Sequence, residues 1–409
     1  MKERRLQDLV LTAMADTPVV LIHGPRQGGK TTLARAIAAR RRAGFVTLDD
    51  AGTLASALND PQGFLADRTG CLVIDEVQRV PDLFRAIKLA VDQDRRPGKF
   101  LLTGSAQTLL LPRLSESLAG RMETLTLWPF AQAEIEGRNP CFLDHAFAEG
   151  AFHPPSSAET RTGLLGRILA GGFPEAQGRT SDLRRRAWFS SYLSATIQRD
   201  IRDLARIEGL SDLPRLTELA AARSAGLLNL ADLARDAGLS YMSLRRYLVL
   251  LETTFLLAVI PAWSTNAAKR AVKAPKLVVC DSGVLAHLLG LTPDRLAGEP
   301  AVFGRLFESF VIMELRKLAD SSAGRPRLFH YREHSGEEVD AVLEDAGGGI
   351  VGVEVKTRQN PEAGDFRGLH ALAARCGRRF RRGIVIHTGR QHVPFGGLFH
   401  AVPVSALWS

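Results

Sequence analysis

The segment from Gly24 to Thr31 has residue types and a spacing that could bind a nucleotide. It reads GPRQGGKT, which fits the pattern G-x-x-x-x-G-K-[ST], and it joins an apolar run at 18–22 to a helical pattern at 31–40. Glycines let backbone N–H groups converge on phosphate oxygens, and the lysine can reach the β- and γ-phosphates. The alternative is a glycine-rich turn between a strand and a helix. The coincidence of strand, motif and helix predicts an ATP site formed by Gly24, Pro25, Arg26, Gln27, Gly28, Gly29, Lys30, Thr31 and Thr32.

Two adjacent acids, Asp75 and Glu76, follow a second apolar run at 71–74. Strands of parallel sheets carry their functional groups at their carboxyl ends. We therefore expect Asp75 to hold Mg²⁺ together with Thr31, and Glu76 to orient and polarise the attacking water. A solvated acidic turn would explain the pair if it stood alone, but the phosphate loop favours an ATPase, with Lys30 and Glu76 as catalytic residues.

A third apolar run at 100–103 ends in Gly104 and Ser105. This run predicts a hydroxyl at the strand end, where a residue that senses the γ-phosphate belongs, so Ser105 joins the predicted catalytic residues. Small polar residues also end strands simply as turns, which is the alternative.

The segment from 230 to 251 has the spacing of a helix-turn-helix. Apolar residues recur at i, i+3 and i+4 in 230–237, Gly238 can form the turn, and Ser240 can cap the second helix. The run at 256–263 can supply a wing strand, so a winged helix is predicted. The second helix is expected to bury Leu244, Leu248 and Leu251 and to expose Tyr241, Arg245 and Arg246.

Recognition helices of this kind enter the major groove of DNA, where arginines contact phosphates or guanine edges. We therefore predict that Arg245 and Arg246 bind duplex or branched DNA. The motif is short, and its spacing is common among helical hairpins. A packing or oligomerisation module with a solvated basic face remains the alternative.

Two strand patterns, at 337–344 and 350–357, flank a glycine-rich turn. A turn centred on Gly347 places Asp340 opposite Glu354, and alternation puts Glu354 and Lys356 on one face. Two carboxylates can bind Mg²⁺ or Mn²⁺, and a lysine can stabilise the charge that develops on a phosphodiester. Asp340, Glu354 and Lys356 are thus predicted catalytic residues, the first two also as metal ligands. The alternative is a Glu–Lys ion pair across an exposed sheet face.

These residues must be positioned by several folded units. Residues 19–140 alternate apolar runs with helical patterns, which is typical of a parallel sheet covered by helices. Helical periodicity with Arg-rich faces follows, interrupted by a predicted loop at 149–160. The expected division of the chain is an ATPase domain, a helical lid or connector, a winged helix and a C-terminal α/β domain, at 1–135, 136–225, 226–275 and 276–409.

The chain resembles prokaryotic AAA-type ATPases of the archaeal ATPase and STAND-related lineage, which carry a C-terminal domain of unknown function. The resemblance covers nearly the whole chain and rests on six motifs, namely GPRQGGKTT at 24–32, LDD at 48–50, LVIDEVQ at 72–78, LLTGSAQ at 101–107, LAGR at 118–121 and GGFPE at 171–175. It implies ring-like homo-oligomers in which an arginine of a neighbouring subunit stabilises the transition state, and Arg121 and Arg199 are the candidates.

The D…E-x-K pattern of the C-terminal domain resembles the PD-(D/E)xK nuclease superfamily. Glu308, in a helical run at 304–318, fits the additional helical acid of that superfamily. The resemblance implies an α/β restriction-endonuclease-like fold that is either an active nuclease or one that has lost catalysis.

Composition sets outer limits on these readings. The chain has 409 residues, and 53 Lys and Arg against 44 Asp and Glu give a formal charge of +9, which suits an anionic partner without establishing one. The cysteines are far apart, which disfavours zinc knuckles and a disulfide framework. No secretory signal or membrane span is expected, so a cytoplasmic protein is predicted. The cysteines are Cys71, Cys141, Cys280 and Cys376.

Three functions agree with these features. The favoured one is an ATP-driven enzyme acting on DNA in remodelling, repair or defence against mobile elements. The second is a nucleotide-switched regulatory or scaffold protein, in which the winged helix and the nuclease-like fold bind protein. The third is the neutralising half of a toxin pair.

Overall fold

The computed structural model describes residues 2–66, 68, 70–105, 118–155, 158–202, 211–333 and 335–409, apart from the side chains of residues 199, 200, 267 and 269. The chain forms two compact units. The first contains residues 3–129 and 253–255, and the second contains residues 130–252 and 256–409 together with Lys2.

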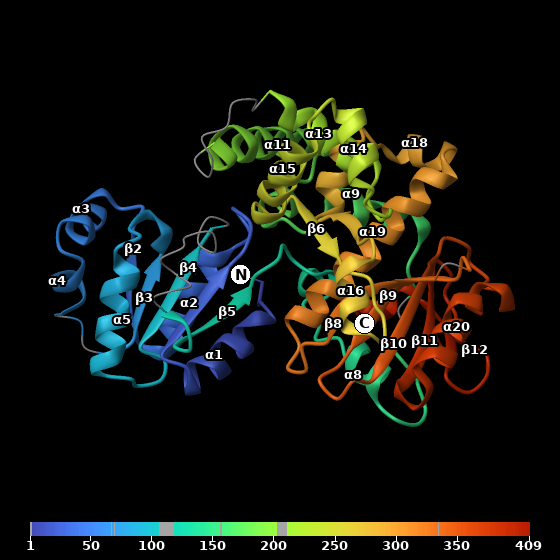
Figure 1. Ribbon diagram of the computed structural model, residues 1–409, viewed down its shortest axis with the longest axis horizontal. Coiled ribbons are helices and arrows are strands. Elements are labelled where there is room, and N and C mark those ends of the chain that lie inside the picture. Colours follow the sequence, from blue (N-terminus) through green and yellow to red (C-terminus); the bar gives the residue numbers. More distant parts are fainter. Residues whose placement is uncertain are drawn as a thin grey trace. The chain divides into compact units, whose positions relative to one another are not determined.

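The first unit is built on a five-stranded parallel sheet with the order β2-β3-β4-β1-β5 (Figure 1). β4 therefore lies between β1, which leads into the phosphate loop, and β3, which ends in the acids. All three predicted strand ends meet at one edge of the sheet. The strands are β1 Val19–His23, β2 Gly44–Thr47, β3 Leu72–Asp75, β4 Phe100–Gly104 and β5 Met122–Thr126.

Helices cover both faces of this sheet, as the fully apolar runs predict. One set of alternate strand residues, including Val20 and Ile22, packs against α1 and α2, and the other, including Val19 and Leu21, packs against α5. This confirms an α/β fold with a P-loop ATPase arrangement. The helices are α1 Leu6–Asp16, α2 Lys30–Arg41, α3 Ala51–Asn59, α4 Pro61–Ala66 and α5 Leu83–Gln93, and a 3-10 turn spans Val77–Arg79.

The second unit begins with helices, as the periodicity after Ala131 predicts. The predicted loop at 149–160 contains no helix or strand in its described residues. The helices are α7 Gln132–Glu136, α8 Phe142–Phe147, α9 Arg161–Ala170, α10 Pro174–Gln177, α11 Asp182–Ala195 and α13 Asp212–Ala222, with a π-helical turn at Thr196–Ile201.

The predicted helix-turn-helix is α14, Leu230–Ala237, followed by α15, Tyr241–Thr253. Gly238 adopts φ 69° at the turn, where glycine has no side-chain penalty. The predicted wing strand is β6, Leu257–Ile260, which pairs antiparallel with β7, Lys276–Val279, while Leu227 bridges to Lys276. This two-stranded sheet crosses the predicted division between residues 275 and 276.

The C-terminal part holds a mixed six-stranded sheet with the order β12-β13-β11-β10-β9-β8. Val353 pairs with Ala341 and Gly352 with Val342, so the predicted hairpin register is confirmed over this part of the ladder. α20 packs on one face of the sheet, and α19 contacts β8, β9 and β10. The strands are β8 Arg327–Arg332, β9 Glu338–Glu344, β10 Ile350–Lys356, β11 Phe380–His387, β12 Val393–Pro394 and β13 Phe399–Pro403.

The remaining helices of the second unit include α19, which has 21 residues. They are α16 Ala267–Val272, α17 Ser282–Leu288, α18 Pro293–Gly298, α19 Pro300–Asp320 and α20 Arg367–Cys376, and 3-10 turns span Ala363–Phe366, Gly377–Arg379 and Val404–Leu407. Among the described residues, no helix combines the length and the apolar composition that crossing a membrane requires.

Candidate functional site

The phosphate loop leaves β1 at Gly24 and enters α2 at Lys30. A Cβ atom at Gly24 would lie 2.2 Å from the carbonyl oxygen of Leu127, so the backbone passes too close for any other residue. The ammonium of Lys30 is buried and donates to the carbonyl oxygens of Gly24 and Pro25, at 3.0 and 2.8 Å. The lysine thus lies folded onto its own loop, within reach of any phosphate that the loop would hold.

Arg4 supports this loop from outside the motif. Its guanidinium is buried and donates to the carbonyl oxygen of Gly28 at 3.1 Å and to that of Trp128. Fixing the Gly28 carbonyl also orients the next peptide N–H at the start of α2. The sequence contains no motif that marks Arg4 for this position.

Asp75 lies at the end of β3 and accepts hydrogen bonds from three hydroxyls. Thr31 donates at 2.9 Å to Oδ1 and 3.1 Å to Oδ2, Thr103 donates at 2.6 Å to Oδ1, and Thr47 donates at 3.1 Å to Oδ2. The predicted pair of Thr31 and Asp75 is therefore in direct contact. Hydroxyl and carboxylate oxygens are ligands that Mg²⁺ accepts, so these residues fit the ion that accompanies ATP.

Glu76 follows Asp75 in a left-handed conformation, with φ 59°. A non-glycine residue in this region costs about 1–3 kcal/mol and is found mainly at functional sites. The Gln78 amide donates to Glu76 Oε2 and, at 3.0 Å, to the hydroxyl of Ser105. Glu76 and Ser105, predicted from separate strands, are thus joined through a residue for which the sequence analysis proposed no role.

The two arginines that the resemblance offers as trans-acting residues are Arg121 and Arg199. Arg121 makes an ion pair with Asp92 at 2.6 Å and also donates to the carbonyl oxygen of Ala119. The side chain of Arg199 lies outside the described residues. A role for either arginine in a neighbouring subunit stays a prediction.

The exposed face of α15 carries the predicted DNA-binding arginines. Leu244, Leu248 and Leu251 are buried as predicted, while Arg245 and Arg246 are exposed and make no ion pair with a described carboxylate. Tyr241 is 48% exposed, as predicted. The same face also exposes two apolar side chains that were not predicted, Met242 at 73% and Val249 at 52%.

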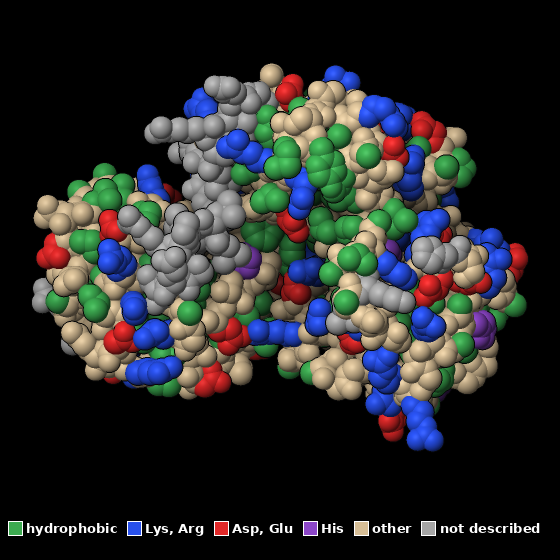
Figure 2. Space-filling view, viewed as in Figure 1, with side chains coloured by type: hydrophobic (Ala, Val, Ile, Leu, Met, Phe, Trp, Pro, Cys, Tyr) green, Lys and Arg blue, Asp and Glu red, His purple; other side chains and the backbone are tan. Residues whose placement is uncertain are grey.

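The surface charge is not concentrated near any one element on the face shown in Figure 2. Lys and Arg side chains are scattered over both units there, and they alternate with acidic and apolar side chains. The positive net charge therefore does not single out a nucleic-acid surface on that face.

The C-terminal carboxylates come together with one additional lysine. Asp340 Oδ2 accepts a hydrogen bond from the N–H of Val355 at 2.9 Å, and the Lys356 ammonium lies 2.8 Å from Glu354 Oε1. The additional residue is Lys276, whose buried ammonium lies 2.6 Å from Glu308 Oε1 and 2.9 Å from Asp340 Oδ1. We call Lys276, Glu308, Asp340, Glu354 and Lys356 the carboxylate cluster.

Burial and mutual charge shift the titration of this cluster. Burial, followed by the neighbouring Asp340, raises the pKa of both Glu308 and Glu354 to about 8. Burial opposes the charged form of Asp340, but Lys276 and the N–H of Val355 hold the pKa of Asp340 below its usual value. Burial likewise opposes the charge of Lys276, yet Asp340 and Glu308 keep the pKa of that lysine above its usual range.

The fit of this cluster to a divalent ion is poor. Asp340, Glu354 and Glu308 adjoin one another as the resemblance implies, but the ammonium of Lys276 already lies between Glu308 and Asp340. Among the described residues, no group of three or more His, Cys, Asp or Glu side chains could hold a metal ion.

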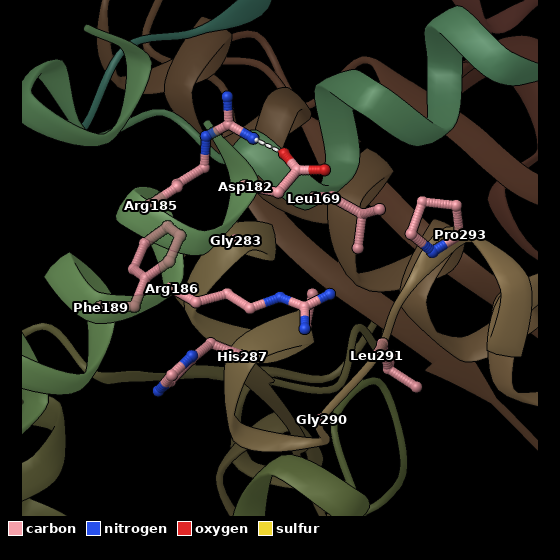
Figure 3. Close-up of a pocket in the computed structure, with 11 residues that line it drawn as sticks. Leu169, Asp182, Arg185, Arg186, Phe189, Gly283, His287, Gly290, Leu291 and Pro293 are labelled. Atoms are coloured by element: carbon pink, nitrogen blue, oxygen red, sulfur yellow. Dashed lines mark hydrogen bonds and ion pairs between the residues drawn. The ribbon is translucent and has the colours of Figure 1, made fainter. Parts of the chain in front are cut away.

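A pocket of about 180 Å³ in the second unit lies between α11 and α17 and was not anticipated from the sequence. Figure 3 shows Arg186 extending across it beside His287, with Arg185 turned to Asp182, which it contacts at 2.5 Å. Burial, followed by the charge of Arg186, lowers the pKa of His287. The pocket is separate from every predicted site in this unit. Its apolar walls are Leu169, Phe189, Ala286, Leu291 and Pro293.

The parallel sheet, the phosphate loop and the Thr31–Asp75 contact define a P-loop ATPase domain of the AAA type. In agreement, the AAA domain family matches residues 16–136. Two domains of unknown function match further along the chain, DUF8612 at residues 161–295 and DUF4143 at residues 303–407.

Two relatives resemble the chain over nearly its full length. They are the uncharacterized proteins Mb2031c of Mycobacterium bovis and Rv2008c of Mycobacterium tuberculosis. Each is 30% identical over 397 residues, which cover 97% of this chain and 82% of the relative. The chain belongs to the family of these mycobacterial proteins.

Several solved structures are similar at lower identity. The Walker-type ATPase PABY2304 of Pyrococcus abyssi is 17% identical over 71% of this chain and 96% of its own, with a TM-score of 0.45. The RuvB Holliday junction branch migration motor of Thermotoga maritima is 19% identical over 63% of this chain and 89% of its own, with a TM-score of 0.30. AMPPCP-bound DnaA of Aquifex aeolicus is 12% identical over 60% of this chain and 85% of its own, with a TM-score of 0.29.

Proposed function

We propose that this protein binds and hydrolyses MgATP. The observation that carries the proposal is the contact of Thr31 with Asp75 beside a buried Lys30 on the phosphate loop. The bound Mg²⁺ would neutralise phosphate charge, and the hydroxyl of Thr31 and the carboxylate of Asp75 are the residues to hold it.

The residues around this contact have separate tasks. Lys30 exchanges its two loop carbonyls for the β- and γ-phosphates. Glu76, held by the Gln78 amide, orients and polarises the attacking water, and Ser105 reports the γ-phosphate through the same amide. Hydrolysis then removes the γ-phosphate charge that Lys30, Glu76 and Ser105 face. The contacts of Glu76 and Ser105, which follow β3 and β4, would therefore differ between the ATP-bound and the ADP-bound protein.

ATP hydrolysis by the full chain tests this proposal. Lys30→Ala should abolish nucleotide binding, whereas Glu76→Gln should keep ATP bound and lose turnover, because it retains the shape and removes the charge. Glu218→Gln makes the same chemical change on an exposed face of α13 and should leave turnover unchanged. Turnover at the parent rate by Glu76→Gln would show that Glu76 does not activate the water.

We further propose that the protein acts on DNA through a winged helix. The order of elements along the chain, α13, Leu227, α14, α15, β6 and β7, supports this. Leu227 and β6 both pair with β7, and the two helices α14 and α15 lie between Leu227 and β6 in the sequence. The exposed arginines Arg245 and Arg246 would face the phosphates or base edges. We propose that the working form is a homo-oligomer, since AAA-type ATPases complete their sites with a neighbour's arginine.

DNA binding is tested by a salt titration. Replacing Arg245 and Arg246 with Ala should weaken binding and flatten the salt dependence by about 0.9 for each phosphate contact that is lost. A matched control replaces Arg215 and Arg235, exposed residues on α13 and α14, and removes the same charge. Equal effects of the two double variants would indicate nonspecific attraction and no winged-helix site.

The second candidate function is a nucleotide-switched scaffold that binds protein through the same helix. Met242 and Val249 favour it, because exposed apolar side chains next to arginines are typical of protein-binding surfaces. Met242→Ser together with Val249→Ser should leave DNA affinity intact if α15 binds DNA by its arginines. Loss of a protein partner with unchanged DNA affinity would favour the scaffold.

For the C-terminal domain we propose a nuclease-like fold. The confirmed register of β9 and β10 and the adjacency of Asp340, Glu354 and Lys356 support this fold. The position of Lys276 bears directly on whether this domain cuts a phosphodiester.

A further inference from the structure

Lys276 reaches the carboxylate cluster from a strand outside the predicted nuclease hairpin. It lies at the start of β7, which pairs with β6, and it also bridges to Leu227. Its side chain is 8% exposed, so its charge is removed from water and depends on the carboxylates for compensation. The short distances to Glu308 and Asp340 supply that compensation.

Four of the six carboxylate oxygens of the cluster are engaged. Asp340 uses Oδ1 for Lys276 and Oδ2 for the N–H of Val355. Glu308 uses Oε1 for Lys276, and Glu354 uses Oε1 for Lys356. Glu308 Oε2 and Glu354 Oε2 remain, the latter buried without a hydrogen-bond partner, and two oxygens fall short of the roughly six ligands that Mg²⁺ takes.

The charges lead to the same result. Two ammonium groups already face the three carboxyl groups, so a divalent ion added to this buried site would leave an excess of positive charge. Such an excess is costly in a medium of low polarity, and it would be relieved only if Lys276 withdrew. Withdrawal would in turn leave that lysine without its partners.

We propose that Lys276 is the resident cation of the carboxylate cluster, and that the cluster holds no divalent metal ion while Lys276 is in place. The ammonium lies between Glu308 and Asp340, two of the carboxylates that a metal-dependent nuclease would use. The C-terminal domain therefore keeps a nuclease-like fold without metal-dependent cleavage. This inference rests on the proposed nuclease-like fold and is independent of ATP hydrolysis.

Mn²⁺ titration of the full chain, followed by electron paramagnetic resonance, tests the inference. All proteins carry Asp75→Asn and are free of nucleotide, so that the phosphate-loop site does not contribute. The parent should show no saturable Mn²⁺ site. Lys276→Met should create one, because it removes the ammonium and keeps an unbranched apolar side chain, and a further Asp340→Asn should abolish it again.

Two further variants separate charge from position. Lys276→Arg keeps the positive charge and should stay without Mn²⁺. Lys273→Met removes a nearby lysine that pairs with Glu333, and it should behave as the parent does.

If Lys276→Met does not fold, measurements on the parent protein still test the inference. A saturable Mn²⁺ site in the parent that Asp340→Asn or Glu354→Gln removes would overturn it. So would Mn²⁺-dependent cleavage of supercoiled plasmid by the parent that Asp340→Asn abolishes. Normal ATP hydrolysis by the otherwise native Lys276→Met chain would show that the ATPase proposal does not depend on the inference about Lys276.

Discussion

At the scale of single residues, the ATP site shows what a motif does and does not predict. The phosphate-loop residues, Thr31 and the acids follow from local patterns, because strand, loop and helix are contiguous in the chain. Arg4, Thr47 and Thr103 were not predicted, because they reach the site from other parts of the sheet or from the N-terminal helix region. Their roles depend on strand order, which a single sequence does not reveal.

Thr103 provides a test of the hydroxyl shell around Asp75. It donates to Asp75 at 2.6 Å and accepts a hydrogen bond from the N–H of Glu76 at 3.1 Å. Thr103→Val keeps the shape, removes one of the hydrogen bonds to Asp75 and leaves the N–H of Glu76 without its acceptor, at a cost of about 1–3 kcal/mol. We expect kcat for ATP to fall by about tenfold or more while nucleotide still binds. Thr53→Val, on α3, is the control, and an unchanged kcat for Thr103→Val would assign Thr103 to packing alone.

Arg4 gives a second test, this time of the loop itself. Arg4→Ala removes the donor that holds the Gly28 carbonyl, so the loop must be ordered when nucleotide binds. We expect the affinity for a nonhydrolysable ATP analogue to fall by about tenfold, equivalent to about 1.4 kcal/mol. Arg5→Ala, which changes the half-buried next residue in the sequence, controls for the lost charge. Equal losses in both variants would point to electrostatic attraction and not to loop order.

At the scale of elements, periodic patterns were the reliable signal. The six residues of α15 that were predicted as buried or exposed are so, although the exposed Met242 and Val249 were missed. The β9–β10 register followed from one glycine-rich turn. The partner of β6 was not predicted, because residues 261–275 separate it from β7 and contain a helix of their own. That pairing brings Lys276 to the carboxylate cluster, so the missed strand partner and the missed cluster residue have one cause.

The GGFPE motif has an element-scale role that its sequence does not state. Gly171 adopts φ 67°, and a Cβ atom there would lie 2.2 Å from Asp281 Oδ1. Asp281 is buried and accepts hydrogen bonds from the N–H groups of Gly172, Gly283 and Val284, which ties α9 to the start of α17.

The tie between α9 and α17 predicts a loss of stability in Asp281→Ala. Three buried N–H groups would lose their acceptor, so the free energy of unfolding of the second unit should fall by about 2–5 kcal/mol. Urea unfolding monitored by circular dichroism measures it. Asp212→Ala, in the exposed first turn of α13, is the control and should change the free energy by less than about 0.5 kcal/mol. A loss in Asp281→Ala no larger than the control's would mean that the motif serves something other than this tie.

At the scale of the whole molecule, the buried histidines predict how stability depends on pH. Burial, followed by the charge of Arg382, lowers the pKa of His400 to about 4, and His392 and His153 lie close to it. Burial, followed by the charge of Lys276, lowers the pKa of His330 to about 4 as well. The unfolded chain takes up these protons near pH 6.5. These two histidines therefore carry fewer protons in the folded protein than in the unfolded chain between about pH 6.5 and pH 4.

Taken by themselves, the two histidines lower the stability in mild acid. Each contributes stability that is complete above pH 6.5 and is lost as the pH falls toward 4, by up to about 1.4 kcal/mol per pH unit. Glu308 and Glu354, with a pKa of about 8, act with the opposite sign, because the folded protein keeps protons that the unfolded chain releases. Urea unfolding at pH 7.5, 6.0 and 5.0 should therefore show the parent losing stability relative to His400→Gln as the pH falls, because glutamine does not titrate. The exposed His370→Gln should follow the parent. If His400→Gln and the parent change in parallel, His400 does not contribute to the pH dependence.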